Sequence, residues 1–323
     1  MSRHLPYHLI LGGAGFIGKH VAYELARSGA SVRIADRTPI AGRLPDDIAS
    51  RISFQRCDLS CADWDDLIAS ACVIYHFAWS SIPASANEDI IKDVGANVIP
   101  TLKLLEAIKR RQPHAPRLIF ASSGGTVYGI PDEVPIPETH KLCPITGYGA
   151  GKAAVELYIS TYRALYDLDI RTVRLANPFG AGQNVSTGQG AATTFLQLAI
   201  SEKPITIWGD GRVIRDYIYI SDAVAGILAV AGTEKSAKFW TYNIGSGVGI
   251  SLNEIIHELE AELGRKLQVT HRCGRAFDVP TNILDISATT ATCGWRPRLS
   301  FGEGLRRTLQ DLQHQKEGYM DRG

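Results

Sequence analysis

Two side chains, Tyr148 and Lys152, have the types and the spacing that could move a proton. Residues four apart lie on one face of a helix, where an ammonium group can lower the pKa of a phenol from its ordinary value of about 10. A phenol tuned in this way can act as a general acid and base toward a hydroxyl or a ketone. In isolation the same pair is usually an aromatic residue on a helix face and a solvated charge. The elements that position the pair therefore decide between the two interpretations.

A glycine-rich turn near the N-terminus indicates which chemistry accompanies this pair. The turn, Gly12–Gly18, has the sequence GGAGFIG; an apolar strand precedes it, a helix opens at Phe16, and a second strand ends beside Asp36. In this context glycines let the backbone approach a pyrophosphate, and the helix N-terminus supplies amide donors. Asp36 is expected to bind the adenosine ribose and to repel a 2′-phosphate, which favours NAD over NADP, although Arg37 weakens that preference slightly. Together with the pair, the turn predicts redox chemistry in which a nicotinamide accepts and returns a hydride.

Apolar strands and amphipathic helices alternate along the first half of the chain. This order predicts an α/β fold with a Rossmann-like, doubly wound parallel sheet covered on both faces. The predicted strands are His8–Leu11, Ser31–Ala35, Ile52–Gln55, Val73–Phe77, Arg117–Ala121 and Ile170–Leu175. The predicted helices are Phe16–Ser28, Asn97–Arg110, Ala150–Leu165, Ala192–Ile200, one that opens with a capping box at Ser251 and Glu254, and Glu303–Gln313.

The pattern loosens after Pro178 into a glycine-rich stretch, Gly180–Gly190. We therefore predict a dinucleotide-binding domain at residues 1–178 and a smaller α/β substrate-binding lobe at residues 179–323. Some later segments, such as Tyr242–Ile244, are expected to return to the first sheet.

The composition argues against several other classes of protein. A chain of 323 residues with 45% hydrophobic side chains can bury a large core, and a net charge of +1 gives no basic field for nucleic acid or a membrane surface. No signal peptide and no membrane-spanning run is recognised. The six cysteines form no CxxC pair, so we expect a cytoplasmic protein with buried or half-buried thiols. Cys57 with Cys61, or His271 with Cys273, could suggest a metal, but no second ligand pair follows at a suitable spacing, and no metal site is predicted.

Further motifs follow one another along almost the whole chain. They are GGAGFIG at Gly12–Gly18, Cys57-Asp58-Leu59, His76-Phe77-Ala78, SSGGTVYG at Ser122–Gly129, YGAGK at Tyr148–Lys152, RLANPFG at Arg174–Gly180, WGDG at Trp208–Gly211, RDYI at Arg215–Ile218, and Asp278-Val279-Pro280. In this set and order the chain resembles the extended short-chain dehydrogenase/reductase family, and within it the nucleotide-sugar epimerases and dehydratases, to which UDP-glucose 4-epimerase belongs.

The resemblance implies that the first domain binds NAD, that the C-terminal lobe holds a nucleoside-diphosphate sugar, UDP-linked, and that catalysis takes place in the cleft between them. It implies that Tyr148 is the base and that Lys152 binds the nicotinamide ribose and stabilises the phenolate. The cofactor-binding residues it implies are Gly12, Gly15, Phe16, Ile17, Gly18, Asp36, Arg37, Asp58, Leu59, Phe77, Ala78, Asn97, Ser122, Tyr148 and Lys152. Asn177, Arg215 and Arg275 match positions that bind the nucleotide, where a guanidinium suits a diphosphate, and Asp278 is expected to be structural.

Two departures from the family pattern bear on the reaction. Gly124 stands where the family usually has a Ser or Thr, whose hydroxyl shares the substrate's O4 proton with the tyrosine. Ser123 and Thr126 flank this gap, and we assign the catalytic and substrate-binding hydroxyl to them, directly or through a water. Ser81 stands where the UDP-glucose 4-epimerase pattern has a lysine near the cofactor, which argues against close identity with that enzyme.

The same loop favours epimerisation over elimination or decarboxylation. Dehydratases of this family need an acidic pair in the loop, and UDP-glucuronate decarboxylases carry a glutamate at the position of Thr126; Gly125 and Thr126 cannot replace them. The reaction we predict is NAD-dependent 4-epimerisation of a UDP-sugar: Tyr148 removes the O4 proton, a hydride passes from C4 to NAD, the 4-keto sugar rotates, and the hydride returns to its other face.

Alternatives remain open at this stage. A nucleotide-sugar dehydratase or reductase of the same family is the main one, and a non-catalytic dinucleotide-binding protein is another. The resemblance also implies a homodimer formed through helices near Asn97–Arg110 and Ala150–Leu165.

Overall fold

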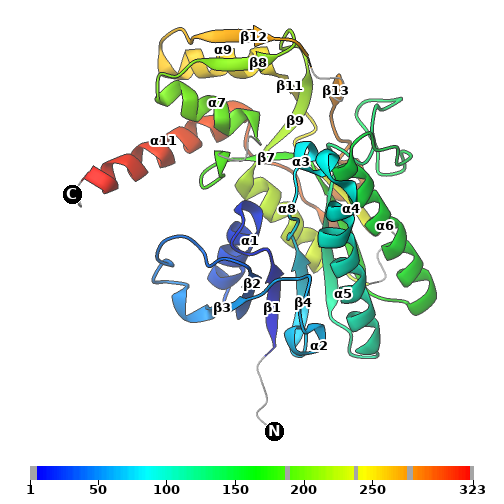
Figure 1. Ribbon diagram of the computed structural model, residues 1–323. Helices are drawn as coiled ribbons and strands as arrows, with labels where there is room; N and C mark the ends of the chain where they lie inside the picture. The colour runs from blue at the N-terminus through cyan, green and yellow to red at the C-terminus, as the bar shows by residue number, and fades with distance from the viewer. Residues whose placement is uncertain (1–5, 186–189, 236–238, 275–278, 321–323) are drawn as a thin grey trace.

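The computed structural model describes residues 6–185, 190–235, 239–274 and 279–320 of the chain. Figure 1 shows a central sheet with helices on both of its faces and a smaller lobe above it. The described helices are α1 (Phe16–Arg27), α2 (Trp64–Leu67), α3 (Pro83–Glu88), α4 (Ile90–Asp93), α5 (Ile99–Arg110), α6 (Gly147–Tyr166), α7 (Ala191–Ile200), α8 (Ile220–Gly232), α9 (Leu252–Leu263), α10 (Ser287–Cys293) and α11 (Phe301–Met320), with the short segments η1 (Ala49–Arg51) and η2 (Val94–Val98). None of these helices, within the described ranges, is long and apolar enough to cross a bilayer.

The larger part of the molecule is built on a seven-stranded sheet. Its strands, in order across the sheet, are β10 (Thr241–Ile244), β6 (Ile170–Leu175), β5 (Arg117–Ser123), β4 (Ala71–His76), β1 (Tyr7–Leu11), β2 (Val32–Asp36) and β3 (Ile52–Arg56). All neighbours in it run parallel. The first strand, β1, lies inside the sheet next to the central β4, and later strands are added on both sides of it, so the predicted Rossmann-like, doubly wound α/β fold is confirmed. In such sheets ligands bind beyond the carboxyl ends of the strands, where the winding reverses, which here is between β1 and β4.

Helices cover both faces of this sheet because alternate strand residues point to opposite sides. Ile10 and Ile119 belong to one buried cluster, together with apolar residues of α1 and α8. Leu9 and Leu118, their neighbours in sequence, belong to a second cluster with residues of α5 and α6. These strands are apolar on both sides, as expected for a parallel sheet buried between two layers of helices.

The smaller lobe is built around β9 (Ile214–Tyr219). Three short strands pair with β9, namely β11 (Gly249–Ser251), β13 (Thr281–Asn282) and β7 (Asn177–Phe179). A separate pair, β8 (Ile205–Trp208) and β12 (Val269–Arg272), lies beside α7 and α9 (Figure 1). The predicted capping box is present at the start of α9, where Ser251 and Glu254 bond to each other's backbone amides.

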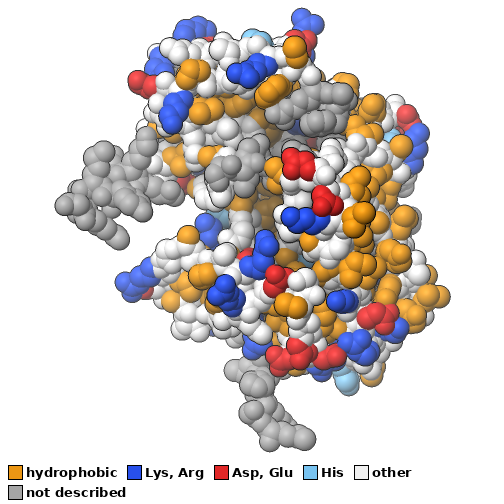
Figure 2. Space-filling model, in the orientation of Figure 1, with side chains coloured by type: hydrophobic (Ala, Val, Ile, Leu, Met, Phe, Trp, Pro, Cys, Tyr) orange, Lys and Arg blue, Asp and Glu red, His pale blue; other side chains and the backbone are white. Residues whose placement is uncertain are grey.

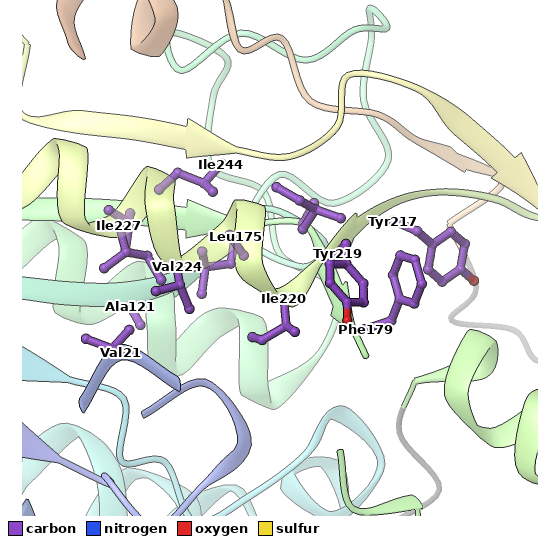
Figure 3. Close-up of a cluster of buried hydrophobic side chains, with 14 of the residues drawn as sticks. Val21, Ala121, Leu175, Phe179, Tyr217, Tyr219, Ile220, Val224, Ile227 and Ile244 are labelled. Carbon is purple, nitrogen blue, oxygen red and sulfur yellow. The ribbon is translucent and has the colours of Figure 1, made fainter. Parts of the chain in front are cut away.

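One hydrophobic core joins the sheet to the smaller lobe (Figure 3). Val21 of α1 and Val224 of α8 lie at one end of the cluster, and Phe179 of β7 and Tyr219 of β9 lie at the other. The ring centroid of Phe179 is 5.7 Å from that of Tyr219 and 5.1 Å from that of Phe301 in α11. These rings pack α11 on β7 and β9 of the smaller lobe, and the cluster continues from there to the apolar residues of the seven-stranded sheet.

The two parts of the chain also exchange strands. The strand β10, which includes the Tyr242–Ile244 segment, pairs with β6 at one edge of the first sheet. The predicted boundary after residue 178 falls inside β7. The division of the chain at that residue stays a prediction.

A π-helical segment, η2, replaces the start of the helix predicted at Asn97–Arg110. Pro100 has no amide hydrogen, so the carbonyl of Ala96 lacks the donor that an α-helix would provide. The turn before the proline is correspondingly wider, and α5 begins at Ile99. Such single wide turns often occur at functional sites.

The six cysteine thiols are free, but most are more exposed than predicted. Cys57 and Cys293 are half-buried, whereas Cys61, Cys72, Cys143 and Cys273 are exposed. The expectation of buried or half-buried thiols is therefore wrong for four of them. Cys61, Cys143 and Cys273 lie on connections between elements, which run over the surface.

A buried ion pair fixes α6 to the sheet. Glu156 of α6 and Arg174 of β6 are each 5% exposed, and Nη2 of the arginine donates to Oε2 of the glutamate at 2.6 Å. Arg174 also donates to the Tyr128 hydroxyl and to the Glu138 carbonyl, both at 2.9 Å, and the Ser122 hydroxyl donates to Glu156. Because both charges are removed from water, each depends on the other.

Glu156→Ala is expected to lower the free energy of unfolding by about 3–5 kcal/mol, because the Arg174 charge would stay buried without its partner. The control is Arg43→Ala, which removes an ion pair with Asp46 whose side chains are 85% and 82% exposed. That change is expected to cost less than about 1 kcal/mol. Urea unfolding followed by circular dichroism measures both variants, and equal losses would contradict the prediction.

Candidate active site

The helix α6 carries both Tyr148 and Lys152 and begins beside the loop that follows β5. Thr146 caps the helix, since its hydroxyl accepts a hydrogen bond from the Gly149 amide at 3.2 Å. A Cβ atom at Gly149 would lie 2.7 Å from the carbonyl oxygen of Thr126. The lack of a side chain at this position thus lets the first turn of α6 pack directly on the loop.

Lys152 is 3% exposed, and its ammonium group lies inside the protein. The group donates a hydrogen bond to the Ala121 carbonyl at 2.7 Å and lies 3.8 Å from the ring centroid of Trp79, in a cation–π contact. Burial lowers the pKa of Lys152 to about 7, against the opposing effect of the Glu156 and Asp93 carboxylates. The charge of this lysine is therefore sensitive to small changes in its surroundings near neutral pH.

The pKa of the Tyr148 phenol shifts in the direction opposite to the one predicted. Burial, and after it the negative charge of Asp93, raise this pKa to about 12. The Lys152 ammonium does not compensate, because it lies 5.8 Å from the Tyr148 ring centroid and closer, at 3.8 Å, to that of Trp79. The prediction that Lys152 lowers the pKa of the phenol is therefore wrong for the protein by itself, and Tyr148 is held in its protonated form.

The glycine turn lies at the carboxyl end of β1, against the loop that follows β4. Gly12 has a φ of +78°, and a Cβ atom there would lie 2.6 Å from the Ala78 amide nitrogen. At Gly18 a Cβ atom would lie 2.3 Å from the Gly12 carbonyl oxygen. The helix α1 then starts after Gly15, which provides no capping side chain, and its first turn has no acidic residue. Its first amides are left for an anion such as a pyrophosphate.

Asp36, at the end of β2, faces this turn. Its carboxylate accepts hydrogen bonds from the amides of Ala14 at 3.0 Å and Thr38 at 3.3 Å. Arg37 beside it is exposed. The close backbone approach, the uncapped helix and this carboxylate together fit a dinucleotide whose pyrophosphate lies at α1.

The other predicted cofactor residues lie at the same edge of the sheet, except Asn97, which is part of η2. Phe16 and Ile17 open α1, Asp58 and Leu59 follow β3, Phe77 and Ala78 follow β4, and Ser122 lies near the end of β5. The amides of Phe77 and Ala78 both donate to the Leu11 carbonyl, at 2.9 and 3.0 Å, and this holds the loop after β4 against the glycine turn. With the exception of Asn97, the structure thus places these residues at the carboxyl ends of the strands, where the glycine turn lies.

Two of those residues use their polar groups inside the protein. The Ser122 hydroxyl donates to Glu156. The Asn97 amide accepts from the Ser80 backbone at 2.7 Å and donates to Asp93 at 2.8 Å. Through these hydrogen bonds, Ser122 and Asn97 hold neighbouring parts of the protein in place. Direct contact with the cofactor stays a prediction for both.

The loop Ser123–Thr126 carries a hydroxyl on either side of Gly124. The Thr126 hydroxyl is buried and has no hydrogen-bond partner among the described residues, whereas Ser123 is half-buried at the end of β5. A Cβ atom at Gly124 would lie 2.6 Å from Cδ1 of Leu284. Leu284 therefore occupies the space that a Ser or Thr side chain would need, and the Asn282 side chain donates to the Gly124 carbonyl at 3.0 Å.

Two of the predicted substrate residues lie on neighbouring strands of the smaller lobe. Asn177 of β7 donates to the Asp216 carbonyl at 2.9 Å. Arg215 of β9 is half-buried, and its guanidinium donates to two main-chain carbonyls at 2.8 and 2.5 Å. Arg275 and Asp278 lie outside the described residues. Binding of the nucleotide by these side chains stays a prediction.

Sequence reasoning gave no role to Trp79 and Asp93, which both lie beside the pair. The Trp79 ring is edge-on to that of Tyr148, with centroids 6.0 Å apart, and it also lies over the Lys152 ammonium. Asp93 is 4% exposed and precedes Asn97 by one helical turn. The sequence signal that could have identified Asp93 was its position four residues before the predicted cofactor residue Asn97, because residues four apart share a helix face.

The fold and the site together place a tyrosine–lysine pair and a glycine turn at the carboxyl ends of the strands of a doubly wound sheet, an arrangement that fits a dinucleotide-binding enzyme. The family model described as "NAD dependent epimerase/dehydratase family" matches residues 8–245. The chain belongs to this family, and its cofactor is NAD.

Individual relatives cover nearly the whole chain. The UDP-glucose 4-epimerase of Thermotoga maritima, solved with UDP-glucose, superposes with a TM-score of 0.88 and 28% identity over 96% of this chain and 99% of that one. The UDP-glucose 4-epimerase of Thermus thermophilus, solved with NAD, gives a TM-score of 0.85 and 28% identity over 95% and 99% of the two chains. The dTDP-4-dehydro-6-deoxyglucose reductase of Escherichia coli is 30% identical over 94% of this chain and 97% of its own length. The relatives thus include both epimerases and a reductase.

Gly124→Ser is expected to destabilise the protein by about 1–3 kcal/mol, because its Cβ atom overlaps Leu284. Leu284→Ala, which alone leaves a cavity, should cost less in the Gly124→Ser background, with a coupling of about 1 kcal/mol or more. Gly125→Ser is the matched control, since a Cβ atom there meets only the Ser123 hydroxyl at 3.9 Å. Urea unfolding of the unmodified protein, the two single variants, the double variant and the Gly125→Ser control measures this, and additive losses would show that Leu284 does not fill the space.

Proposed function

We propose that the protein is a 4-epimerase of a UDP-linked sugar, acting through a transient 4-keto sugar with Tyr148 as the acid and base. The observation that carries this proposal is the composition of the loop packed on the start of α6. Between Ser123 and Thr126 the loop offers hydroxyl groups and no ionisable side chain. Removal of water or carbon dioxide would require further acid and base groups, whereas epimerisation at C4 requires one group that accepts and returns a single proton.

When bound, NAD supplies the acceptor and donor of the hydride at C4 of the sugar. Lys152 would bind its nicotinamide ribose, and Gly12, Gly15 and Gly18 would let the backbone and the N-terminus of α1 hold its pyrophosphate. Asp36 would bind its adenosine ribose.

Tyr148 needs a positive charge nearby before it can act as a base. Its pKa of about 12 makes it an acid in the protein by itself. The Lys152 ammonium, together with the positive charge that oxidised NAD carries, would stabilise the phenolate. Tyr148 could then take the O4 proton of the sugar and give it back after the ring has turned.

The hydroxyl that assists Tyr148 is assigned to Thr126 or Ser123. Thr126 has the stronger support, because its buried hydroxyl lacks a partner among the described residues and could satisfy a sugar oxygen or a bridging water. Asn177, Arg215 and Arg275 would hold the nucleotide, with the arginines binding the diphosphate.

A reductase acting on a 4-keto sugar nucleotide is the second candidate. The likeness to the Escherichia coli reductase favours it, at an identity similar to that with the epimerases. The two reactions share the tyrosine and the lysine and differ in whether the cofactor is consumed. Net oxidation of NADH or NADPH therefore distinguishes them.

A panel of UDP-galactose, UDP-N-acetylglucosamine and UDP-glucuronate, incubated with the purified protein without added cofactor, tests the proposal. We expect one of them to give a product of unchanged mass that separates as the 4-epimer. A product lighter by water or carbon dioxide would overturn the epimerase proposal, and so would turnover that requires added reduced cofactor.

Tyr148→Phe is expected to lower kcat by about 10²–10⁴-fold, the usual contribution of a general acid and base. Bound NAD, measured by absorbance after release from the denatured protein, should be retained, because the substitution keeps the ring and removes only the hydroxyl. Activity close to that of the unmodified protein would exclude Tyr148 as the base.

The proposed functional unit is a homodimer formed through the helices implied by the resemblance, α5 and α6, to which we add the neighbouring α4 because of its exposed apolar side chains. Figure 2 shows hydrophobic side chains gathered on the side of the molecule where α6 lies. The exposed ones include Ile91 at 87%, Leu157 at 64% and Leu165 at 66%. A second copy of the chain would remove this surface from water.

Leu157→Glu is therefore expected to shift the protein from dimer to monomer, because a charge would be buried at the interface. The control is Ile130→Glu, a similar change at a side chain 61% exposed outside these helices, which should leave the dimer intact. Sedimentation velocity measures both. A monomeric unmodified protein would contradict the proposed dimer.

A further inference from the structure

Asp93, the last residue of α4, is a buried carboxylate beside the tyrosine–lysine pair. Its exposed fraction is 4%. One oxygen, Oδ1, accepts hydrogen bonds from the Ser81 hydroxyl and from the Asn97 side chain, the latter at 2.8 Å. Aspartate is almost never buried in this way unless its charge is paired. The second oxygen therefore requires an explanation.

That second oxygen, Oδ2, is directed toward α6. It is buried and has no hydrogen-bond partner in the described part of the chain. A Cβ atom at Gly151 would lie 3.2 Å from it. Gly151 follows Tyr148 by three residues and precedes Lys152 by one, so the oxygen lies against the turn of α6 that carries the pair.

The other titratable groups around the pair are bound to partners or uncharged. Glu156, one turn further along α6, is paired with Arg174 at 2.6 Å. His76 of β4 is buried, and burial, followed by the Lys152 charge, lowers its pKa to about 3, so it is neutral near pH 7. Among the described residues Asp93 is thus the carboxylate that faces the pair without an arginine or lysine salt bridge of its own.

A negative charge at this place acts on both members of the pair. It adds to the effect of burial in raising the pKa of Tyr148. For Lys152 it works together with Glu156 against the effect of burial, which lowers the pKa. The charge therefore favours the protonated form of both side chains.

We propose that Asp93 is a positioning residue for the proton transfer, whose unpaired carboxylate oxygen keeps Lys152 charged inside a buried site and Tyr148 protonated until the cofactor is in place. It acts through the pair and does not touch the sugar. Its hydrogen bonds to Ser81 and Asn97 fix the direction of the free oxygen, and Gly151 leaves room for it. This role rests on the proposed function in so far as Tyr148 and Lys152 are the working pair.

The test is Asp93→Asn, which keeps the shape of the side chain and removes its charge. Without the negative charge the Tyr148 phenolate is more stable and the Lys152 ammonium is less stable, so the pKa values of both groups fall. The rise of kcat/KM with pH, as Tyr148 loses its proton, and its fall, as Lys152 loses its charge, should both move to lower pH by about 1–2 units, the effect expected of one neighbouring charge in a buried site.

Two matched variants separate charge from structure. Ser81→Ala removes a hydrogen bond to Asp93 and leaves the charge, so it should reduce activity at every pH without moving the limbs of the profile. Glu88→Gln makes the same carboxylate-to-amide change at an exposed residue just before α4 and should leave the profile unchanged. If Asp93→Asn does not fold, Asp93→Ser removes the same charge with a smaller side chain and should give the same shift.

A second measurement is independent of turnover. In protein labelled with ¹³C at the tyrosine Cζ, the Tyr148 signal is identified by its loss in Tyr148→Phe and titrated with NAD bound. The midpoint should be lower in Asp93→Asn by the same 1–2 units or so. An unmoved midpoint would overturn the proposal for Asp93, whether or not a sugar substrate has been found. A moved midpoint with no turnover of any UDP-sugar would leave Asp93 as proposed and count against the epimerase function.

Discussion

The close approach of α6 to the loops after β4 and β5 is the constraint on which the site depends. Gly149 and Gly151 make it possible, because a Cβ atom at either position would lie about 3 Å from the Thr126 backbone or from Trp79 and Asp93. The approach buries Lys152, leaves Tyr148 half-buried, and brings hydroxyl, indole and carboxylate groups against one helical turn. Glycine is a poor helix former, by about 1 kcal/mol relative to alanine, so α6 gives up local stability at these positions for close packing.

Burial makes every charge in this region depend on its neighbours. Arg174 and Glu156 are paired, and through Ser122 they hold β5 beside α6. Lys152 has a carbonyl and the Trp79 ring in place of a carboxylate partner, and its pKa falls accordingly. Arg174 and Glu156 are thus fixed in their ionised states, whereas Tyr148 and Lys152 can still change their protonation states.

The sequence was sufficient for the features that depend on local pattern. The alternation of strands and helices predicted the parallel sheet, and the glycine spacing with Asp36 predicted the turn at the end of β1, because both arise from residues near each other in the chain. The pair at Tyr148 and Lys152 was also placed correctly on one helix.

The failures arose where distant segments meet. The pKa of Tyr148 was predicted in the wrong direction because the prediction considered only its neighbour on the helix, whereas burial and Asp93 dominate. Leu284 packs on Gly124 from a distant part of the sequence, and no local sequence pattern predicts that contact. The wide turn before Pro100 was missed because its residues have ordinary helical periodicity.

The proposed reversible epimerisation requires a group that donates and accepts a proton about equally well, since the two 4-epimers differ little in energy. Burial and Asp93 favour the phenol, and Lys152 with the charge of oxidised NAD favours the phenolate. A tyrosine whose pKa is shifted strongly up or down would transfer the proton slowly in one of the two directions. The opposing charges around Tyr148 are therefore those expected of a group that works as both acid and base, as proposed here, and under that proposal they account for an unpaired carboxylate so close to the pair.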